Sequence, residues 1–178
     1  RTYDIGAPLS KVCELKPGQT PNVDKLMPTI DWSTDADFGL QSNFVTHAIA
    51  NLTAPSAGAY TFRLTSDDGS KLYVGDKLVI DHDGLHGVDP PKEGTIDLTA
   101  GVHPLRIEHF ERDGGQELRL AWRTPGSGDF VTVPNSALTT DAGVVRVTAP
   151  GRKECVSGTD TPGDGLPLAG VNPGYDLT

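Results

Sequence analysis

Apolar and polar residues alternate in short stretches along the middle of the chain. In AYTFRLTS (residues 59–66), Tyr60, Phe62 and Leu64 fall on one side of an extended strand, with threonine and arginine between them. ELRLAWRT (residues 117–124) has the same period of two. This period is typical of a strand with one buried face, so both stretches predict half-buried strands.

Further strands are predicted wherever the alternation recurs, at residues 43–53, 71–74, 77–80, 94–100, 102–111 and 130–133. Gly75-Asp76 separates two of these stretches by two residues, as a tight hairpin requires, and glycine supplies the positive φ angle of such a turn. Seven or eight short strands without a helical period predict an all-β fold, either a sandwich or a barrel.

Both ends of the chain lack this alternation. Residues 1–34 are rich in proline, glycine and polar residues, so we expect an irregular lead-in that wraps the domain. Residues 149–178 are rich in glycine and proline, which is typical of a tail or of a linker to a further domain. We therefore expect the β domain at residues 35–148, as a monomeric module within a larger chain.

Size and charge narrow the possible partners. The 178 residues are enough for one domain with a sizeable core. The formal net charge of −9, without a cluster of lysine and arginine, argues against nucleic acid and anionic membranes as partners. No apolar run approaches the ~18 residues that a membrane-spanning helix needs, which argues against membrane insertion. An acidic chain of this kind suits cations or neutral ligands.

Two cysteines, Cys13 and Cys155, lie near opposite ends of the expected folded part. We predict a disulfide between them and hence an oxidising environment, as for a secreted or cell-surface protein. In the chain-entropy account, closing so long a loop stabilises a fold by roughly 4 to 5 kcal/mol. Two unrelated buried thiols are the alternative.

Two adjacent acids, Asp67 and Asp68, stand at the junction of two predicted strands. Their like charges repel, and a divalent cation would compensate that repulsion. A second acidic turn, FERDGGQE (residues 110–117), follows a later predicted strand. Because Asp-Asp-Gly and Asp-Gly-Gly are also ordinary turn sequences, the residues alone leave open both a metal site and two plain turns.

The string SDDGSKLYVGDKLVIDHDG, followed by LTAGVHPLRIEHFERDGGQELRLAW, resembles the protective-antigen type of β-sandwich module. This family of fourteen-kilodalton domains recurs in yeast flocculins, bacterial adhesins and secreted sugar-active enzymes. The resemblance covers roughly residues 30–135. It implies an antiparallel, jelly-roll-like β-sandwich with irregular extensions at both ends.

The resemblance also implies a calcium site. In lectin members of the family, the adjacent acids are joined by a cis peptide, and both carboxylates bind one calcium ion. A later loop supplies one side-chain oxygen and two main-chain carbonyls, which fall here on Glu111, Asp113 and Gly115. Several lectin members have an amide where this chain has Glu111, so the site implied here is more anionic.

A sugar site follows from the same resemblance, because calcium with open coordination positions accepts vicinal hydroxyls of a neutral sugar. Residues 80–87 (IDHDGLHG) resemble the first ligand-facing loop of the family. The implied carbohydrate contacts are Asp67, Asp68, Asp81, His82, Asp83 and His86. The spacing of His82 and His86 is also compatible with zinc, but Asp83-Gly84 breaks a helix, so we expect the two rings not to converge.

Three functions are compatible with the sequence. They are a calcium-dependent carbohydrate-binding module, a metal-free structural or protein-docking module appended to a secreted sugar-active enzyme, and an enzyme fragment without its catalytic part. The sequence contains no nucleophile elbow and no phosphate-binding loop. Paired carboxylates can hydrolyse a glycoside, but Asp67 and Asp68 would share one site, with both carboxylates bound by the metal. We therefore expect a non-catalytic binding module.

Overall fold

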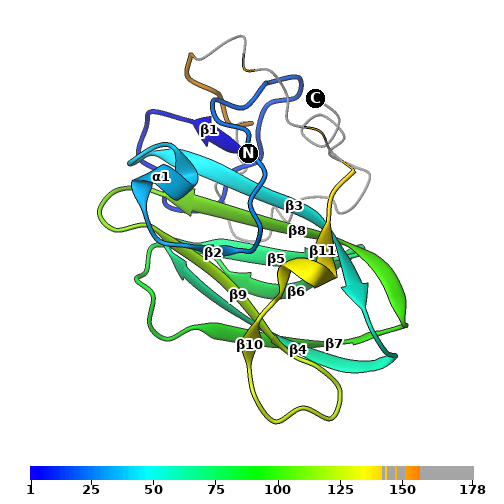
Figure 1. The fold of residues 1–178 in the computed structure, drawn as a ribbon. Coiled ribbons are helices and arrows are strands. Elements are labelled where there is room, and N and C mark those ends of the chain that lie inside the picture. Colours follow the sequence, from blue (N-terminus) through cyan, green and yellow to red (C-terminus); the bar gives the residue numbers. More distant parts are fainter. Residues whose placement is uncertain (142, 144–146, 148–150, 157–178) are drawn as a thin grey trace.

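The computed structural model describes residues 1–141, 143, 147 and 151–156 of the chain. Within these residues, two antiparallel β-sheets pack against each other as a sandwich (Figure 1). The all-β sandwich expected from the alternation and from the family resemblance is confirmed. Most of the tail predicted at residues 149–178 lies outside the described residues.

The first sheet contains β1 (Thr2–Asp4), β3 (Phe44–Ala54), β8 (Gly101–Glu111), β5 (Ser70–Val74) and β6 (Lys77–His82) in this order, and β11 (Leu138–Thr139) pairs with β3. The second sheet contains β10 (Val131–Thr132), β9 (Glu117–Arg123), β4 (Gly58–Asp67) and β7 (Lys92–Leu98), and β2 (Asp31–Trp32) pairs with β9. A short helix α1 (Asp35–Phe38) and a 3-10 turn (Asn135–Ala137) complete the described elements.

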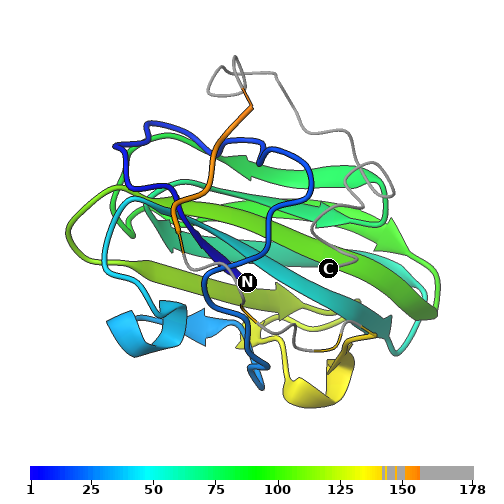
Figure 2. The ribbon, with the colours of Figure 1, turned by 90° about the horizontal axis from the view of Figure 1, so that it is seen from above.

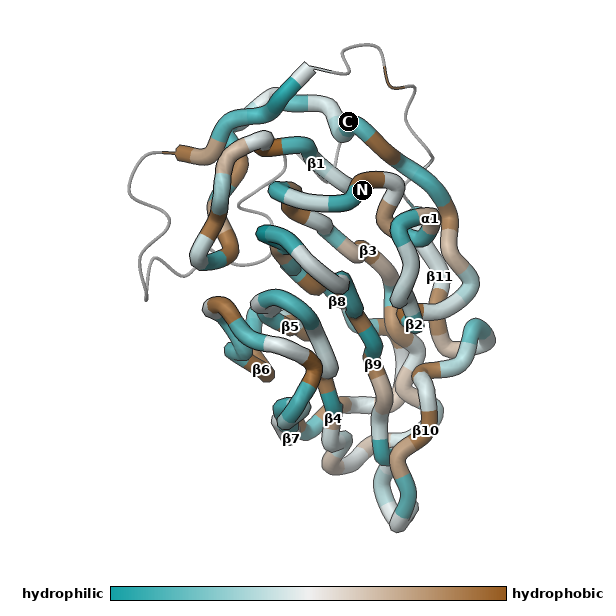
Figure 3. The backbone as a smooth tube through the Cα atoms, turned by 90° about the vertical axis from the view of Figure 1, so that its left-hand side faces the viewer, coloured by the Kyte–Doolittle hydropathy of each residue, from teal (hydrophilic) through white to brown (hydrophobic). Residues whose placement is uncertain are grey.

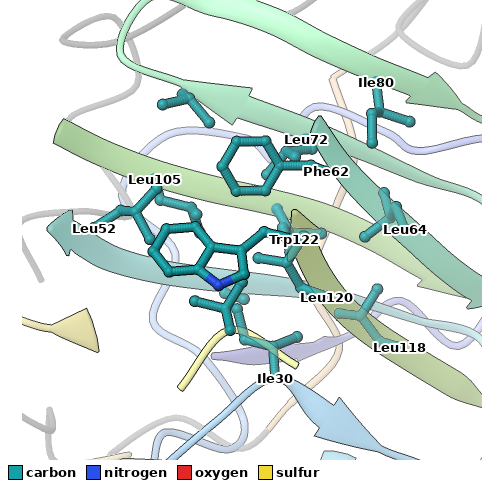
Figure 4. Packing of buried hydrophobic residues seen from close by; sticks show 14 of the residues in the cluster. Ile30, Leu52, Phe62, Leu64, Leu72, Ile80, Leu105, Leu118, Leu120 and Trp122 are labelled. Carbon is teal, nitrogen blue, oxygen red and sulfur yellow. The ribbon is translucent and has the colours of Figure 1, made fainter. Parts of the chain in front are cut away.

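Alternating side chains from the two sheets fill the space between them (Figure 4). Phe62 and Leu64 of β4 are fully buried, as the sequence pattern predicts, and Trp122 of β9 packs against Phe62 with ring centroids 6.2 Å apart. Figure 3 shows brown hydrophobic and teal hydrophilic positions mixed along the strands. Burial of these apolar side chains provides the main driving force for the fold.

The predicted hairpin at Gly75-Asp76 joins β5 to β6. Val74 pairs directly with Lys77, and Gly75 adopts a φ angle of 60°, in the left-handed region that glycine enters without steric cost. The hairpin therefore fixes the register of β5 and β6 at one end of the pair. The Asp67-Asp68 pair lies at the opposite end, just before β5.

The lead-in packs over the outer face of the first sheet (Figure 2). Tyr3, Leu9 and Leu15 form a second apolar cluster with Val45 of β3 and Phe110 of β8. This cover explains why β8 is buried at every position from residue 105 to residue 111, whereas a one-sided strand would alternate.

The predicted disulfide between Cys13 and Cys155 is present, with a sequence separation of 142 residues. Beside it, Leu15 forms an isolated antiparallel bridge with Cys155, and Lys16 donates its backbone N–H to the Glu154 carbonyl at 2.8 Å. The disulfide therefore fastens residues 154–156 to the lead-in. Every helix in the described part of the chain is too short and too polar to cross a bilayer.

Candidate metal and sugar site

The candidate site lies at one end of the sandwich, where the chain passes twice between the sheets. Residues 68–69 connect β4 to β5, and residues 112–116 connect β8 to β9. Asp67 pairs with Glu117 across the second sheet, and Ser70 pairs with His109 across the first. The strand registers therefore bring the two acidic turns identified in the sequence side by side.

Three carboxyl groups meet at this end. Asp67, Asp68 and Glu111 each offer an oxygen within 4.8 Å of the others. Glu111 is fully buried, and the Asp68 backbone N–H acts on its carboxylate, but neither oxygen forms a hydrogen bond of good geometry with a described residue. A buried carboxylate without well-formed hydrogen bonds is costly, so the site has acceptor capacity that a cation would satisfy.

The backbone around these acids is held by its neighbours. The peptide bond between Asp67 and Asp68 is cis, as the family resemblance implies. His109 of β8 donates from its ring Nε2 to the Asp67 carbonyl at 2.8 Å, and the Arg112 backbone N–H donates to Asp68 Oδ2 at 3.0 Å. His109 was not among the candidate residues from the sequence, because its position within a core strand gave no sign of this contact.

The clustering changes the proton affinity of two of the acids. Burial, followed by the nearby charge of Asp68, raises the pKa of Asp67 to about 6. Burial, followed by the charges of Asp68 and Asp67, raises the pKa of Glu111 to about 8. Both shifts show that negative charge is unfavourable here in the absence of a positive partner.

The residue types fit calcium better than a softer metal. Calcium binds six to eight oxygen ligands, and three carboxyl groups supply several of them. Asp113 and Gly115 lie in the 112–116 turn, and the Asp113 side chain points out to solvent, 81% exposed. Asp113 and Gly115 would therefore contribute to a metal site only through their backbone carbonyls, as the family resemblance implies.

Gln116 anchors the turn that carries these two carbonyls. It is 4% exposed, and its side-chain amide donates to Asp35 Oδ1 at 2.6 Å and to the Leu40 carbonyl at 3.1 Å. These bonds tie the turn to α1 and to the segment that follows it. Gln116 is a second positioning residue that the sequence did not reveal, because its partners are distant along the chain.

The loop after β6 brings two histidines together. The rings of His82 and His86 are in close, tilted contact, with centroids 3.9 Å apart and an interplanar angle of 31°. The expectation that they would not converge was wrong: the loop needs no helix, because the His86 Nε2 contacts the His82 carbonyl at 2.7 Å and folds the loop back on itself. His86 also lies close enough to Asp67 for its charge to lower the Asp67 pKa.

The carboxylates of Asp81 and Asp83, in the same loop, interact with other groups of the protein. Asp81 Oδ1 accepts a hydrogen bond from the Asp83 backbone N–H at 3.2 Å. Asp83 Oδ1 accepts from the backbone N–H groups of Val12 and Gly84, at 2.8 Å and 2.9 Å, and its Oδ2 lies 3.7 Å from Lys71 Nζ. The Asp83 carboxylate therefore has partners inside the protein on both oxygens.

Gly69 brings this loop against the acidic pair. A Cβ atom at Gly69 would lie 2.6 Å from the Gly84 backbone nitrogen and 2.7 Å from Phe110 Cε1. Only glycine permits so close an approach of two backbones. The loop at 81–87 therefore lies beside the residue that follows Asp68.

The fold and this acidic end define a β-sandwich with a candidate cation site between two inter-sheet connections. The chain belongs to the PA14 domain family, whose sequence profile matches residues 1–136. No sequence among curated proteins matches this chain.

Solved structures show the same fold. An anti-sigma factor domain-containing protein from Clostridium clariflavum is 22% identical, with 78% of this chain and 49% of that chain covered and a TM-score of 0.62. A PA14 sugar-binding domain from an RTX adhesin is 19% identical, with 75% and 99% covered and a TM-score of 0.53. The epithelial adhesin 9 A domain from Candida glabrata, in complex with Galb1-3GlcNAc, is 14% identical, with 62% and 66% covered and a TM-score of 0.50. This chain spans less than half of the anti-sigma factor proteins that it matches.

Proposed function

We propose that this chain is a non-catalytic carbohydrate-binding module of a secreted or cell-surface protein, and that its sugar site depends on calcium. The observation that carries the proposal is the meeting of Asp67, Asp68 and Glu111 at the end of the sandwich, with both Glu111 oxygens buried and without a hydrogen bond of good geometry from the described residues. Two structures with the same fold, the PA14 sugar-binding domain of the RTX adhesin and the adhesin domain in complex with Galb1-3GlcNAc, support the choice of ligand class.

In this proposal the three carboxylates hold the cation, and the backbone carbonyls of Asp113 and Gly115 complete the protein's share of the ligands. His109 and Gln116 keep the two turns in place through their bonds to backbone and to α1. Bound calcium supplies open coordination positions for two adjacent hydroxyls of a neutral sugar.

The 81–87 loop would form the rim of the sugar site. His82 and His86 present stacked rings beside the acidic pair, and Asp81 is exposed. Asp83 holds the loop in place, because both of its oxygens already have protein partners. We therefore assign direct contact with the sugar to Asp67, Asp68, Asp81 and His82. His86 supports the His82 ring, because both of its own ring nitrogens contact backbone carbonyls.

A calorimetric titration with calcium tests the metal half of the proposal. The chelator-treated protein should bind one calcium ion, and Asp68→Asn should lose that binding. Asp76→Asn, which removes an equal charge from the exposed turn at the other end of β5, should keep it. At a hundredfold excess over Kd, calcium should stabilise the fold by about 2.7 kcal/mol, so the melting temperature should rise.

A second titration tests the sugar half. With calcium present, a monosaccharide such as glucose, mannose or fucose should bind with a Kd of about 1 mM, since one ring makes few net contacts, and chelator should abolish the heat. Polysaccharides should bind more tightly because several sites act at high effective concentration. If calcium binds and a broad glycan array stays blank, the module is a docking unit instead, and a protein partner insensitive to chelator is expected.

A further inference from the structure

A second group of buried ionisable side chains lies on the outer face of the first sheet, under the lead-in. Lys71 of β5 pairs directly with Glu108 of β8, so the two side chains project from the same face. On its other side, β5 pairs with β6, which leads into the loop that carries Asp83. Lys71 and Asp83 therefore meet, and Glu108 projects beside Lys71 from the same face of the sheet, close enough for the Lys71 charge to lower its pKa.

Each of the three groups is largely removed from water. The side chains of Lys71 and Asp83 are 9% and 13% exposed, with Lys71 Nζ 3.7 Å from Asp83 Oδ2. The Glu108 side chain is fully buried, and neither of its oxygens accepts a hydrogen bond from the described residues. Burying a lysine and two acids so closely costs more solvation energy than a surface ion pair does.

The two oxygens of Asp83 are in unlike environments. Oδ1 accepts hydrogen bonds from two backbone N–H groups, of Val12 and Gly84, while Oδ2 faces the lysine amine. Two backbone N–H donors on one oxygen of a carboxyl group are the arrangement that stabilises negative charge during attack on its carbon. The oxygen that faces the amine is the one that would leave.

We propose that Lys71 and Asp83 join in a spontaneous amide bond, with Glu108 carrying the proton. The Lys71 Nζ–Asp83 Cγ bond forms and the Cγ–Oδ2 bond breaks. Two protons of the ammonium group depart with Oδ2 as one water molecule. Glu108 takes a proton from Nζ and returns it to Oδ2, so it ends as it began, and no oxidant or other reactant is needed.

Several features of the site favour this reaction. Holding amine and carboxyl group in contact gives them a high effective concentration, and exclusion of water opposes hydrolysis of the product. Burial raises the pKa of Asp83 and raises that of Glu108 to about 7, although the charges of Arg106 and Lys71 oppose the Glu108 shift. Glu108 can therefore both accept and release a proton near neutral pH.

The surroundings of Glu108 are consistent with this role. Arg106 Nη2 lies 3.2 Å from Glu108 Oε1, and the Arg106 guanidinium lies over the Tyr73 ring, 4.7 Å from its centroid. Glu14 of the lead-in also acts on Glu108, since its charge raises the Glu108 pKa. The amide would fix the 81–87 loop to β5 whether or not this end of the domain binds calcium or sugar.

Intact-mass spectrometry of the purified chain tests the proposal directly. The mass should fall below that of the disulfide-bonded sequence by one water molecule. Lys71→Arg keeps the positive charge and Glu108→Gln keeps the shape, and both variants should retain that water. Lys77→Arg, at an exposed position of β6, should lose it as the wild type does.

A tryptic digest locates the bond. Trypsin should fail to cut after Lys71, and residues 64–77 should appear joined to residues 78–92 through Lys71 and Asp83. A wild-type mass without the loss of water, or a loss of water that survives in Lys71→Arg, overturns the amide bond. Full cross-linking in Glu108→Gln overturns the part assigned to Glu108.

Discussion

At the scale of single residues, the acidic end is unfavourable alone and favourable with a cation. Asp67 and Glu111 both have raised pKa values because burial and neighbouring negative charge disfavour their ionised forms. A cation reverses both causes, since it neutralises the charge and replaces the lost water. The same acids therefore predict that the stability of the metal-free protein falls with rising pH and that its calcium affinity rises.

The first concerns the chelator-treated protein. Raised pKa values mean that the folded state holds protons that the unfolded state has already lost, so stability falls as pH rises from about 4.5 to about 8. Glu111→Gln removes the larger contribution and should flatten the decline. Urea unfolding across this range checks the slope, and equal slopes for wild type and Glu111→Gln would contradict the assignment.

The second concerns calcium affinity. Protons compete with the metal for Glu111, so the affinity should rise by up to about tenfold per pH unit as pH increases from about 6 to about 8. Glu111→Gln should bind calcium more weakly at the higher pH, and its affinity should depend less on pH. Calorimetric titrations at several pH values measure both effects. An affinity independent of pH in the wild type would place the ion elsewhere.

At the scale of elements, the sequence predicted all the longer strands and missed the shortest ones, β1, β2 and β11. The alternation of β4 and β9 located both strands, because polar residues on their outer faces mark the period. β5 is buried at all five positions, and its sequence was recognised as a strand through the hairpin turn that follows it. β1 and β2 lie in the segment read as irregular, since strands of three and two residues are too short to show a period.

Part of the candidate site was predictable because its acids lie at the ends of predicted strands. Asp67, Asp68 and Glu111 stand at strand ends, so their convergence followed from the family resemblance once the strands were placed. The stacking of His82 and His86 was missed because it depends on a hydrogen bond from a ring to a backbone carbonyl, which no residue pattern encodes.

The β5–β6 hairpin allows a direct test at the element scale. Gly75 has a positive φ angle and open space around its Cα, so an alanine there would be strained by the backbone and not by contacts. Gly75→Ala should lower the free energy of unfolding by about 1 kcal/mol. Gly87→Ala, which also meets open space but lacks the positive φ, should change it by about 0.5 kcal/mol or less. Equal effects of both substitutions in urea unfolding would refute this account of the turn.

At the scale of the whole molecule, the lead-in and residues 151–156 close over one sheet. The disulfide holds this cover, and the neighbouring bonds include one from the Val156 backbone N–H to the Glu14 carbonyl at 2.7 Å. Asn43 links the cover to the site, because its carbonyl accepts from Ile5 and its N–H donates to the Arg112 carbonyl. Backbone hydrogen bonds therefore connect the lead-in through Asn43 to the turn beside Asp68.

Removal of the disulfide should destabilise the whole domain. The bond closes a loop of about 142 residues, so its loss frees the unfolded chain, and the expected cost is roughly 2–5 kcal/mol. The double variant Cys13→Ala/Cys155→Ala measures this in urea unfolding, with the reduced wild type as a second arm. A cost below about 1 kcal/mol would show that the apolar cluster alone holds the lead-in.

The charge of the molecule predicts which polysaccharides it retains. With a net charge of −9, the chain repels polyanions at low ionic strength, whereas a neutral glycan feels no long-range force and would be held only by short-range bonds at the proposed calcium site. Calcium-dependent retention on a neutral polysaccharide should therefore change little between about 0.05 M and about 0.5 M sodium chloride, and chelator should abolish it. A sulfated polysaccharide should be poorly retained at the lower salt concentration. Affinity chromatography on both matrices measures these differences, and strong retention on the sulfated matrix that falls with salt would contradict recognition of a neutral sugar.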